Sequence, residues 1–146
     1  TTVTQDEALK VLGSVLGVLT FASGALGSIS LLVGGVGIAT IMTIAVTERT
    51  PEIGLLRALG SPRSQILRLF LGEAALLAAA GGAAGLILGI AIARLLTVVL
   101  PALPVSTPWW FALLAEGMAV TIGLVAGVLP ARHAARMEPV DALRAE

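Results

Sequence analysis

The sequence has no cysteine, a single histidine and few charged residues. Without cysteine, neither a disulfide nor a thiolate metal site can form. The single histidine, His133, is too little for a metal site, and we interpret it as a solvated interfacial residue. Nine basic residues balance nine acidic residues, so no net charge would attract nucleic acid. The chain also lacks a paired nucleophile and base, so we expect no enzymatic activity and no bound cofactor in it.

The sequence is rich in apolar residues. Hydrophobic residues make up 57% of the chain, and the mean hydropathy is +1.01. Charged residues make up 12%, against a usual share of about 25% in soluble domains. This composition predicts an all-α membrane protein embedded in a lipid bilayer. The start of the chain is polar and acidic, without the basic region of a signal peptide, and it lacks an initiator methionine, which indicates a fragment or a processed chain.

The first apolar run is long enough for more than one membrane crossing. No charge occurs between Lys10 and Glu48, and one helix over this run would be about 55 Å long, against a hydrocarbon core of about 30 Å. Either the run crosses twice, with a turn near residues 23–24, or one helix projects beyond the membrane. We prefer the single helix, with an outer stalk over residues 4–23 and a span over residues 25–46.

Two further apolar runs predict two further spans. We place them over residues 69–93 and 109–129, with a cytoplasmic tail over residues 130–146. Prolines break the helix between these spans, and two tryptophans follow, as is typical of an aromatic belt at a membrane interface. These residues are Pro101, Pro104, Pro108, Trp109 and Trp110.

Glycines recur every four residues in both of these spans. Small residues at this spacing let a second helix approach closely. The pattern comprises Gly81, Gly85 and Gly89 in the second span, and Gly123 and Gly127 in the third. We therefore predict that these glycines lie in helix–helix contacts.

Two acidic residues fall inside the apolar runs. Glu73 lies about one turn inside the second span, and we interpret it as an interfacial carboxylate. Glu116 lies near the middle of the third span, where an acidic charge costs at least about 2.5–3.5 kcal/mol. It should be paired, protonated or beside a wet cavity, and we predict a pair with Arg94. The alternative is a shifted span that leaves Glu116 at the interface.

A short polar segment separates the first span from the second and carries helix signals at both ends. Thr50 is a suitable N-cap, and Pro51 then takes the first helical position. Gly60 can adopt the left-handed conformation that ends a helix, and Pro62 prevents continuation. The segment therefore predicts a helix over residues 51–59.

This short helix carries one broad apolar side and needs something to pack against. It is either a docking element for a partner protein or a linker on the bilayer surface, and the pattern favours neither. The apolar side consists of Ile53, Leu55, Leu56 and Leu59.

The basic residues predict the orientation. With three spans, the short helix and the tail share one side of the membrane. That side carries seven basic residues and the other carries two, which places the short helix and tail in the cytoplasm and the N-terminus outside. The seven are Arg49, Arg57, Arg63, Arg68, Arg132, Arg136 and Arg144, and the two are Lys10 and Arg94.

Three ordered motifs give the sequence a family resemblance. Residues 46–61 resemble the signature of FtsX-like permeases of ABC transporters, of the MacB type. Residues 31–38 resemble the glycine-rich segment before that signature, and residues 130–144 resemble the family's C-terminal motif. Two positions depart from the pattern, because Pro51 stands where a basic residue is frequent and Glu116 where an apolar residue is usual.

The resemblance implies a partner for the short helix. The chain would supply the last three membrane helices of a permease that dimerises with a second permease copy. Its helix over residues 51–59 would be a coupling helix, seated in a cytoplasmic ATP-binding subunit or domain that holds ATP and magnesium. The docking residues would be Ile53, Leu55, Leu56 and Leu59, with Glu52 and Arg57 at the rim and Glu48 and Arg49 at the membrane exit.

This resemblance implies export or release of a substrate, driven by motion passed across the membrane, and leaves the cargo open. A competing interpretation is a self-contained oligomeric membrane protein or small channel, with glycine faces packing its subunits. That interpretation predicts that no ATPase copurifies and that the central polar segment tolerates charge reversal.

Overall fold

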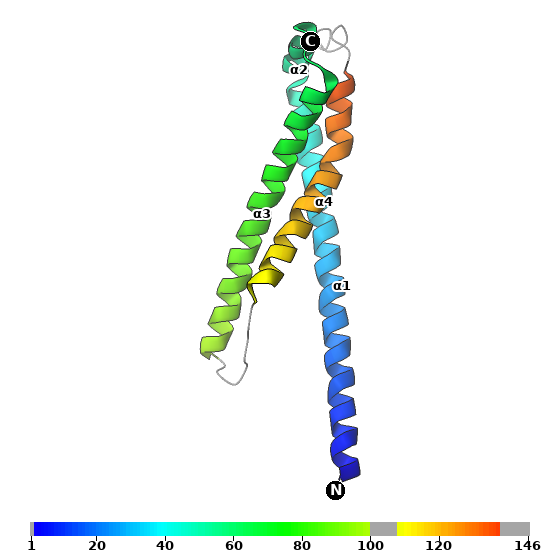
Figure 1. The fold of residues 1–146 in the computed structure, drawn as a ribbon, viewed down its shortest axis with the longest axis vertical. Helices are drawn as coiled ribbons and strands as arrows, with labels where there is room; N and C mark the ends of the chain where they lie inside the picture. Colours follow the sequence, from blue (N-terminus) through cyan, green and yellow to red (C-terminus); the bar gives the residue numbers. More distant parts are fainter. Residues whose placement is uncertain (1, 100–107, 138–146) are drawn as a thin grey trace. The chain divides into compact units, whose positions relative to one another are not determined.

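The computed structural model describes residues 2–99 and 108–137, and these form four α-helices without a strand (Figure 1). Three of the helices are long and apolar enough to cross a membrane. The prediction of an all-α membrane fold with three long helices and one short helix is therefore confirmed. The helices are α1 (Thr2–Glu48), α2 (Thr50–Ala58), α3 (Arg63–Val99) and α4 (Trp109–Arg136).

The chain divides into two compact units, of which the first ends at Gly34 and consists of the N-terminal part of α1. Its described side chains are exposed apart from the partly buried Leu31. The helix continues through Ser23 and Gly24 without a turn, as expected for one helix rather than two crossings. The Ser23 hydroxyl donates to the Leu19 carbonyl at 2.8 Å, so this polar group is satisfied inside the helix without water.

The second unit begins at Gly35 and has one hydrophobic core, to which all four helices contribute. Phe70 of α3 is the largest fully buried side chain, at 1% exposure. The core lies where α2 packs against its neighbours, so the short helix is part of the fold. The buried residues of the core are Met42, Val46, Ile53, Ile66, Phe70, Ala74, Ala131, Ala134 and Ala135.

Helices α3 and α4 run antiparallel (Figure 1), and they pack through small residues. A Cβ atom added to Gly127 would lie 2.6 Å from the Cβ of Ala74, and one added to Gly123 would collide with the Ala78 methyl. Both glycines are buried. The absent side chains therefore allow the two backbones to approach closely.

Helix α4 differs from the predicted third span at its C-terminal end. It continues through Pro130 to Arg136, so its last residues belong to the segment that the sequence analysis placed in the tail. A proline inside a helix removes one backbone hydrogen bond. Three alanines after it are buried in the core, and this packing holds the last two turns in helical form. They are Ala131, Ala134 and Ala135.

The predicted membrane boundaries stay predictions. Helix α3 has 37 residues, about 55 Å of helix, so it is longer than the roughly 30 Å of a hydrocarbon core. The span predicted over residues 69–93 lies within it. The predicted proline-rich loop around Pro101 and Pro104, and the tail from residue 138 onward, lie outside the described residues.

Candidate docking surface on α2

Helix α2 follows α1 after a single intervening residue, Arg49. The Ile53 amide donates to the Arg49 carbonyl at 3.0 Å. Thr50 is not the N-cap, because it is already helical and its hydroxyl donates back to the Val46 carbonyl at 3.1 Å. The predicted cap is therefore wrong. The Thr50 hydrogen bond instead links the start of α2 to the last turn of α1, which restricts motion between the two helices.

The end of α2 is a Schellman turn, closed by Gly60 as the sequence predicted. Gly60 has φ of 92°, in the left-handed region that favours glycine. Its amide donates to the Arg57 carbonyl at 3.1 Å, and the Ser61 amide donates to the Leu56 carbonyl at 3.0 Å. The Arg57 guanidinium also donates to the Ser61 carbonyl at 3.1 Å. These bonds fix the direction in which α3 leaves.

Ile53 requires a correction to the predicted docking face. Its side chain is 2% exposed and belongs to the core together with Ile66 and Phe70 of α3. It therefore anchors α2 to α3 instead of facing a partner. Leu55 and Leu59 face outward and are 56% and 77% exposed, whereas Leu56, which is 42% exposed, lines a cavity beside α3.

An ion pair links the start of α2 to α3. Arg49 Nη1 lies 3.3 Å from Glu73 Oε2, with both side chains partly exposed. The sequence pattern indicated an interfacial carboxylate at Glu73 and gave no sign of this partner 24 residues away. A partly exposed pair contributes at most about 1 kcal/mol, so its main consequence is positional. Glu48 and Glu52 are exposed.

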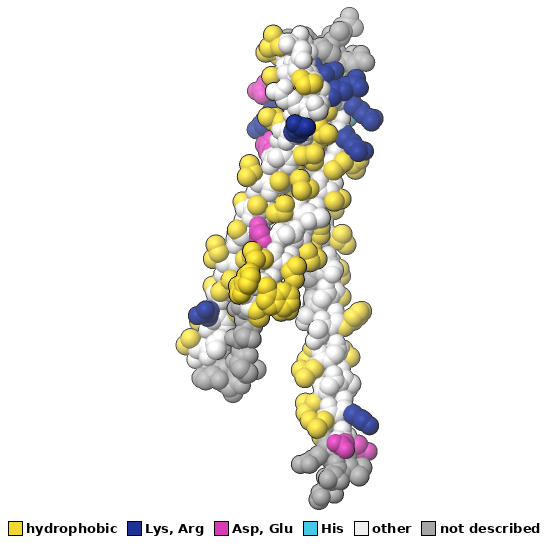
Figure 2. Space-filling model, in the orientation of Figure 1, with side chains coloured by type: hydrophobic (Ala, Val, Ile, Leu, Met, Phe, Trp, Pro, Cys, Tyr) yellow, Lys and Arg dark blue, Asp and Glu magenta, His cyan; other side chains and the backbone are white. Residues whose placement is uncertain are grey.

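Basic side chains gather around the end of the second unit that contains α2 (Figure 2). They come from α2, from the first turns of α3 and from the last turns of α4. The cluster consists of Arg57, Arg63, Arg68, Arg132 and Arg136, with the exposed His133 among them. Arg144, which was predicted on the same side, lies outside the described residues. An acidic partner surface would complement this end of the molecule.

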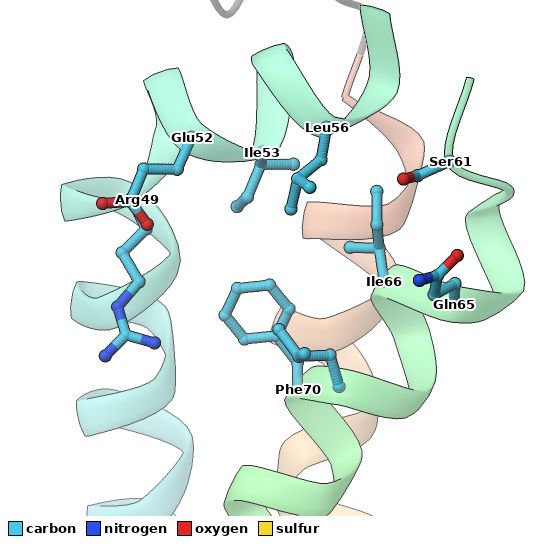
Figure 3. A pocket seen from close by; sticks show the side chains of 9 residues that line it. Arg49, Glu52, Ile53, Leu56, Ser61, Gln65, Ile66 and Phe70 are labelled. Atoms are coloured by element: carbon cyan, nitrogen blue, oxygen red, sulfur yellow. The ribbon is translucent and has the colours of Figure 1, made fainter. Parts of the chain in front are cut away.

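A small apolar cavity of about 160 Å³ lies between α2 and α3. Figure 3 shows Ile53 and Leu56 pointing into it from α2, and Ile66 and Phe70 from α3. An apolar cavity of about 150 Å³ can accept a group as large as benzene. The polar residues at its edge are Arg49, Glu52, Ser61 and Gln65. The site can therefore receive one bulky apolar side chain beside the exposed leucines.

The predicted pair of Arg94 and Glu116 is not formed. In the described part of the chain Glu116 Oε2 is enclosed without a hydrogen-bond partner. A Cβ added to Gly82 would lie 2.5 Å from that oxygen, so the carboxylate packs on the α3 backbone there. Gly82 and Arg94 are twelve residues apart, about 18 Å along the helix. The antiparallel register thus separates the two charges.

The predicted glycine contacts divide between the two helices. Gly123 and Gly127 lie in the α3–α4 contact, whereas Gly81, Gly85 and Gly89 have open space where a side chain would be. The α3 residues that α4 does meet are offset from this stripe. They include Leu71, Ala74, Ala78 and Gly82.

These features define a multi-pass membrane protein with a short helix that is anchored on one side and exposes leucines on the other. Residues 24–139 match the family model for the FtsX-like permease C-terminal region. The chain belongs to this family.

Curated relatives support the same assignment. The chain is 44% identical over 140 residues to the macrolide export ATP-binding/permease protein MacB of Rhodopirellula baltica, covering 96% of this chain and 20% of that protein. It is 45% identical to MacB of Syntrophobacter fumaroxidans, covering 96% and 19%. It is 38% identical to the uncharacterized ABC transporter permease YknZ of Bacillus subtilis, covering 97% and 35%. The chain thus spans between a fifth and about a third of these relatives.

Proposed function

We propose that this chain is the membrane-anchored coupling region of an ABC transporter permease, in which α2 docks on a cytoplasmic ATP-binding subunit or domain. The observation that carries the proposal is the division of α2 into a buried side and an exposed side. Ile53 is 2% exposed and Leu59 is 77% exposed. The names of the relatives, ATP-binding/permease protein and ABC transporter permease, support such a partner.

The contacts of α2 explain how motion would pass through it. A docked ATP-binding subunit that moves on ATP hydrolysis displaces Leu55, Leu56 and Leu59. The helix cannot swivel independently, because Ile53 is buried in the core and Gly60 closes a hydrogen-bonded turn to α3. The displacement of α2 is therefore passed on to α1 and α3, which would move with it. Two permease copies would transmit it together and drive export or release of a substrate.

Cysteine crosslinking in the full-length protein tests the docking. Leu59→Cys is compared with Val98→Cys, a matched control because both positions are 77% exposed and Val98 lies near the other end of α3. A bifunctional thiol reagent is added to membranes, and crosslinked peptides are identified by mass spectrometry. This readout detects both a fused ATP-binding domain and a separate subunit.

We expect Leu59→Cys to capture peptides of an ATP-binding domain and Val98→Cys to capture none. If Leu59→Cys captures only copies of itself, α2 is not a docking helix for an ATPase. The self-contained oligomeric membrane protein then becomes the better account of the chain.

A further inference from the structure

A second and larger groove, of about 600 Å³, lies between the C-terminal half of α3 and the first turns of α4. Large apolar side chains gather over the start of α4 (Figure 2). Trp109 and Phe111 contribute to its lining from α4, and Gly85, Gly89 and Ile90 from α3. The groove is away from α2, and the proposed docking does not use it.

The floor of this groove is open because of two glycines. A Cβ added to Gly85 or Gly89 would meet nothing within 4 Å. The stripe that predicted helix packing is therefore left uncovered by α4 along this stretch. An apolar slot of this kind inside a membrane-spanning segment suits a flexible hydrocarbon chain.

One charged side chain, Arg94, lines the groove at its end toward the C-terminus of α3. It forms no ion pair with another residue in the described ranges 6–99 and 108–137. The connection over residues 100–107 contains no acidic residue either. An arginine offers five N–H donors and no acceptor, so the group that complements this end of the groove is an anion.

The length of the groove matches one leaflet of a bilayer. Gly82 and Arg94 both line it, and twelve residues of helix separate them by about 18 Å. Half of a hydrocarbon core is about 15 Å. A molecule with its anionic end at Arg94 thus lays an apolar tail along Gly89 and Gly85, as far as Gly82, which the Glu116 carboxylate covers.

We propose that this groove is a binding site for one anionic phospholipid. The phosphate accepts hydrogen bonds from Arg94, one acyl chain lies on Gly85 and Gly89, and Trp109 covers the chain near the headgroup. Charge selects the lipid, because a net negative headgroup gains more from an unpaired arginine than a zwitterionic headgroup does. The site rests only on α3 and α4 being membrane helices, and it stands or falls independently of the docking of α2.

Photolabelling of the full-length protein tests this site. The protein is reconstituted in phosphatidylcholine nanodiscs that contain a trace of phosphatidylglycerol or phosphatidylcholine with a diazirine on one acyl chain. Labelled peptides are identified by mass spectrometry after illumination. We expect phosphatidylglycerol to label the peptides around Gly85 and Trp109 about fivefold more than phosphatidylcholine does, the size expected for one arginine near an anionic group.

The stripe itself provides a matched control. Gly85→Leu fills the groove, whereas Gly81→Leu adds the same side chain one turn away, at a glycine that does not line it. Gly85→Leu should abolish the labelling, and Gly81→Leu should leave it unchanged. Arg94→Gln should remove the preference for phosphatidylglycerol, and Arg94→Lys should retain most of it, so loss of folding is separated from loss of the charge.

Two results would overturn the proposal. Equal labelling by both lipids in wild type and in Arg94→Gln would make the groove an ordinary lipid-facing surface. If labelling is absent and Gly85→Leu, but not Gly81→Leu, dissociates the protein in mass photometry, a second copy of the chain occupies the groove instead.

Discussion

The close approach between α3 and α4 depends on two glycines, Gly123 and Gly127, which have no side chain. Gly127 faces Ala74, and Gly123 faces Ala78. In a bilayer, lipid tails compete equally for apolar surface, so close van der Waals contact has to hold helices together. These glycines therefore stabilise the helix pair indirectly, because they let Ala74 and Ala78 come into close contact with α4.

Gly127→Ala should destabilise the permease by about 1–3 kcal/mol, the usual cost of overpacking a tight contact. The added methyl would lie 2.6 Å from the Ala74 Cβ, so α3 and α4 must separate. Steric-trap unfolding in bicelles measures the change. Gly81→Ala is the control, because a Cβ there meets nothing within 4 Å. The double change Gly127→Ala with Ala74→Gly should recover most of the loss, and equal stability of Gly127→Ala and Gly81→Ala would contradict the contact.

Arg94 and Glu116 should behave as independent residues. Their helices are in a register that places Glu116 against Gly82 and not beside Arg94. The effects of Arg94→Ala and Glu116→Ala on unfolding free energy should therefore add to within about 0.3–0.5 kcal/mol. The same cycle on Arg49 and Glu73, which lie 3.3 Å apart, should show a coupling of about 0.2–1 kcal/mol. A larger coupling for the first pair than for the second would overturn this assignment.

At the scale of the element, α2 is a nine-residue helix that could not persist alone in water. It is held by the buried Ile53, by the Thr50 hydroxyl on α1 and by the Gly60 turn into α3. These attachments leave Leu55 and Leu59 facing outward. Stability is thus assigned to one side of this helix, and the proposed docking to the other.

That division predicts opposite effects for two truncations. Ile53→Ala should lower the unfolding free energy by about 2–5 kcal/mol, because it leaves a cavity beside Phe70. Leu59→Ala, at an exposed position, should change stability by less than about 0.5 kcal/mol and yet reduce the coupling of ATP hydrolysis to transport. Thermal unfolding and ATPase assays on the full-length transporter separate the two. Loss of stability in Leu59→Ala with normal coupling would refute the division.

At the scale of the whole molecule, some features follow from the sequence because they are local or additive. A membrane helix is recognised from the total hydropathy of about 20 consecutive residues. Three long apolar helices could therefore be predicted, although their ends could not. The end of α2 was predictable because Gly60 and Pro62 act within a few residues. The predicted cap at Thr50 failed because α1 extends to Glu48, and the Thr50 hydroxyl donates to the Val46 carbonyl in the last turn of α1.

The remaining features depend on how helices pair, which no local pattern contains. Ile53 belongs to the same apolar side as Leu59, and packing in the core with Ile66 and Phe70 of α3 buries Ile53 and leaves Leu59 exposed. The partner of Glu73 is 24 residues away on another helix. Likewise the glycine stripe of α3 predicted a contact, but the register of α4 uses residues beside the stripe instead. Sequence periodicity defines faces, and tertiary packing selects among them.

The distribution of arginines over the molecule carries the last prediction, which concerns orientation. Six described arginines lie at the α2 end of the second unit, whereas Arg94 lies toward the other end of α3. Because basic residues are retained in the cytoplasm, Ser64→Cys should react with an impermeant maleimide only after cells are permeabilised. Pro108→Cys should react in intact cells. Both positions are exposed, so access to reagent reports membrane side. The opposite labelling pattern would place α2 outside the cell, where no ATP-binding subunit could reach it, and the coupling function would fail together with the topology.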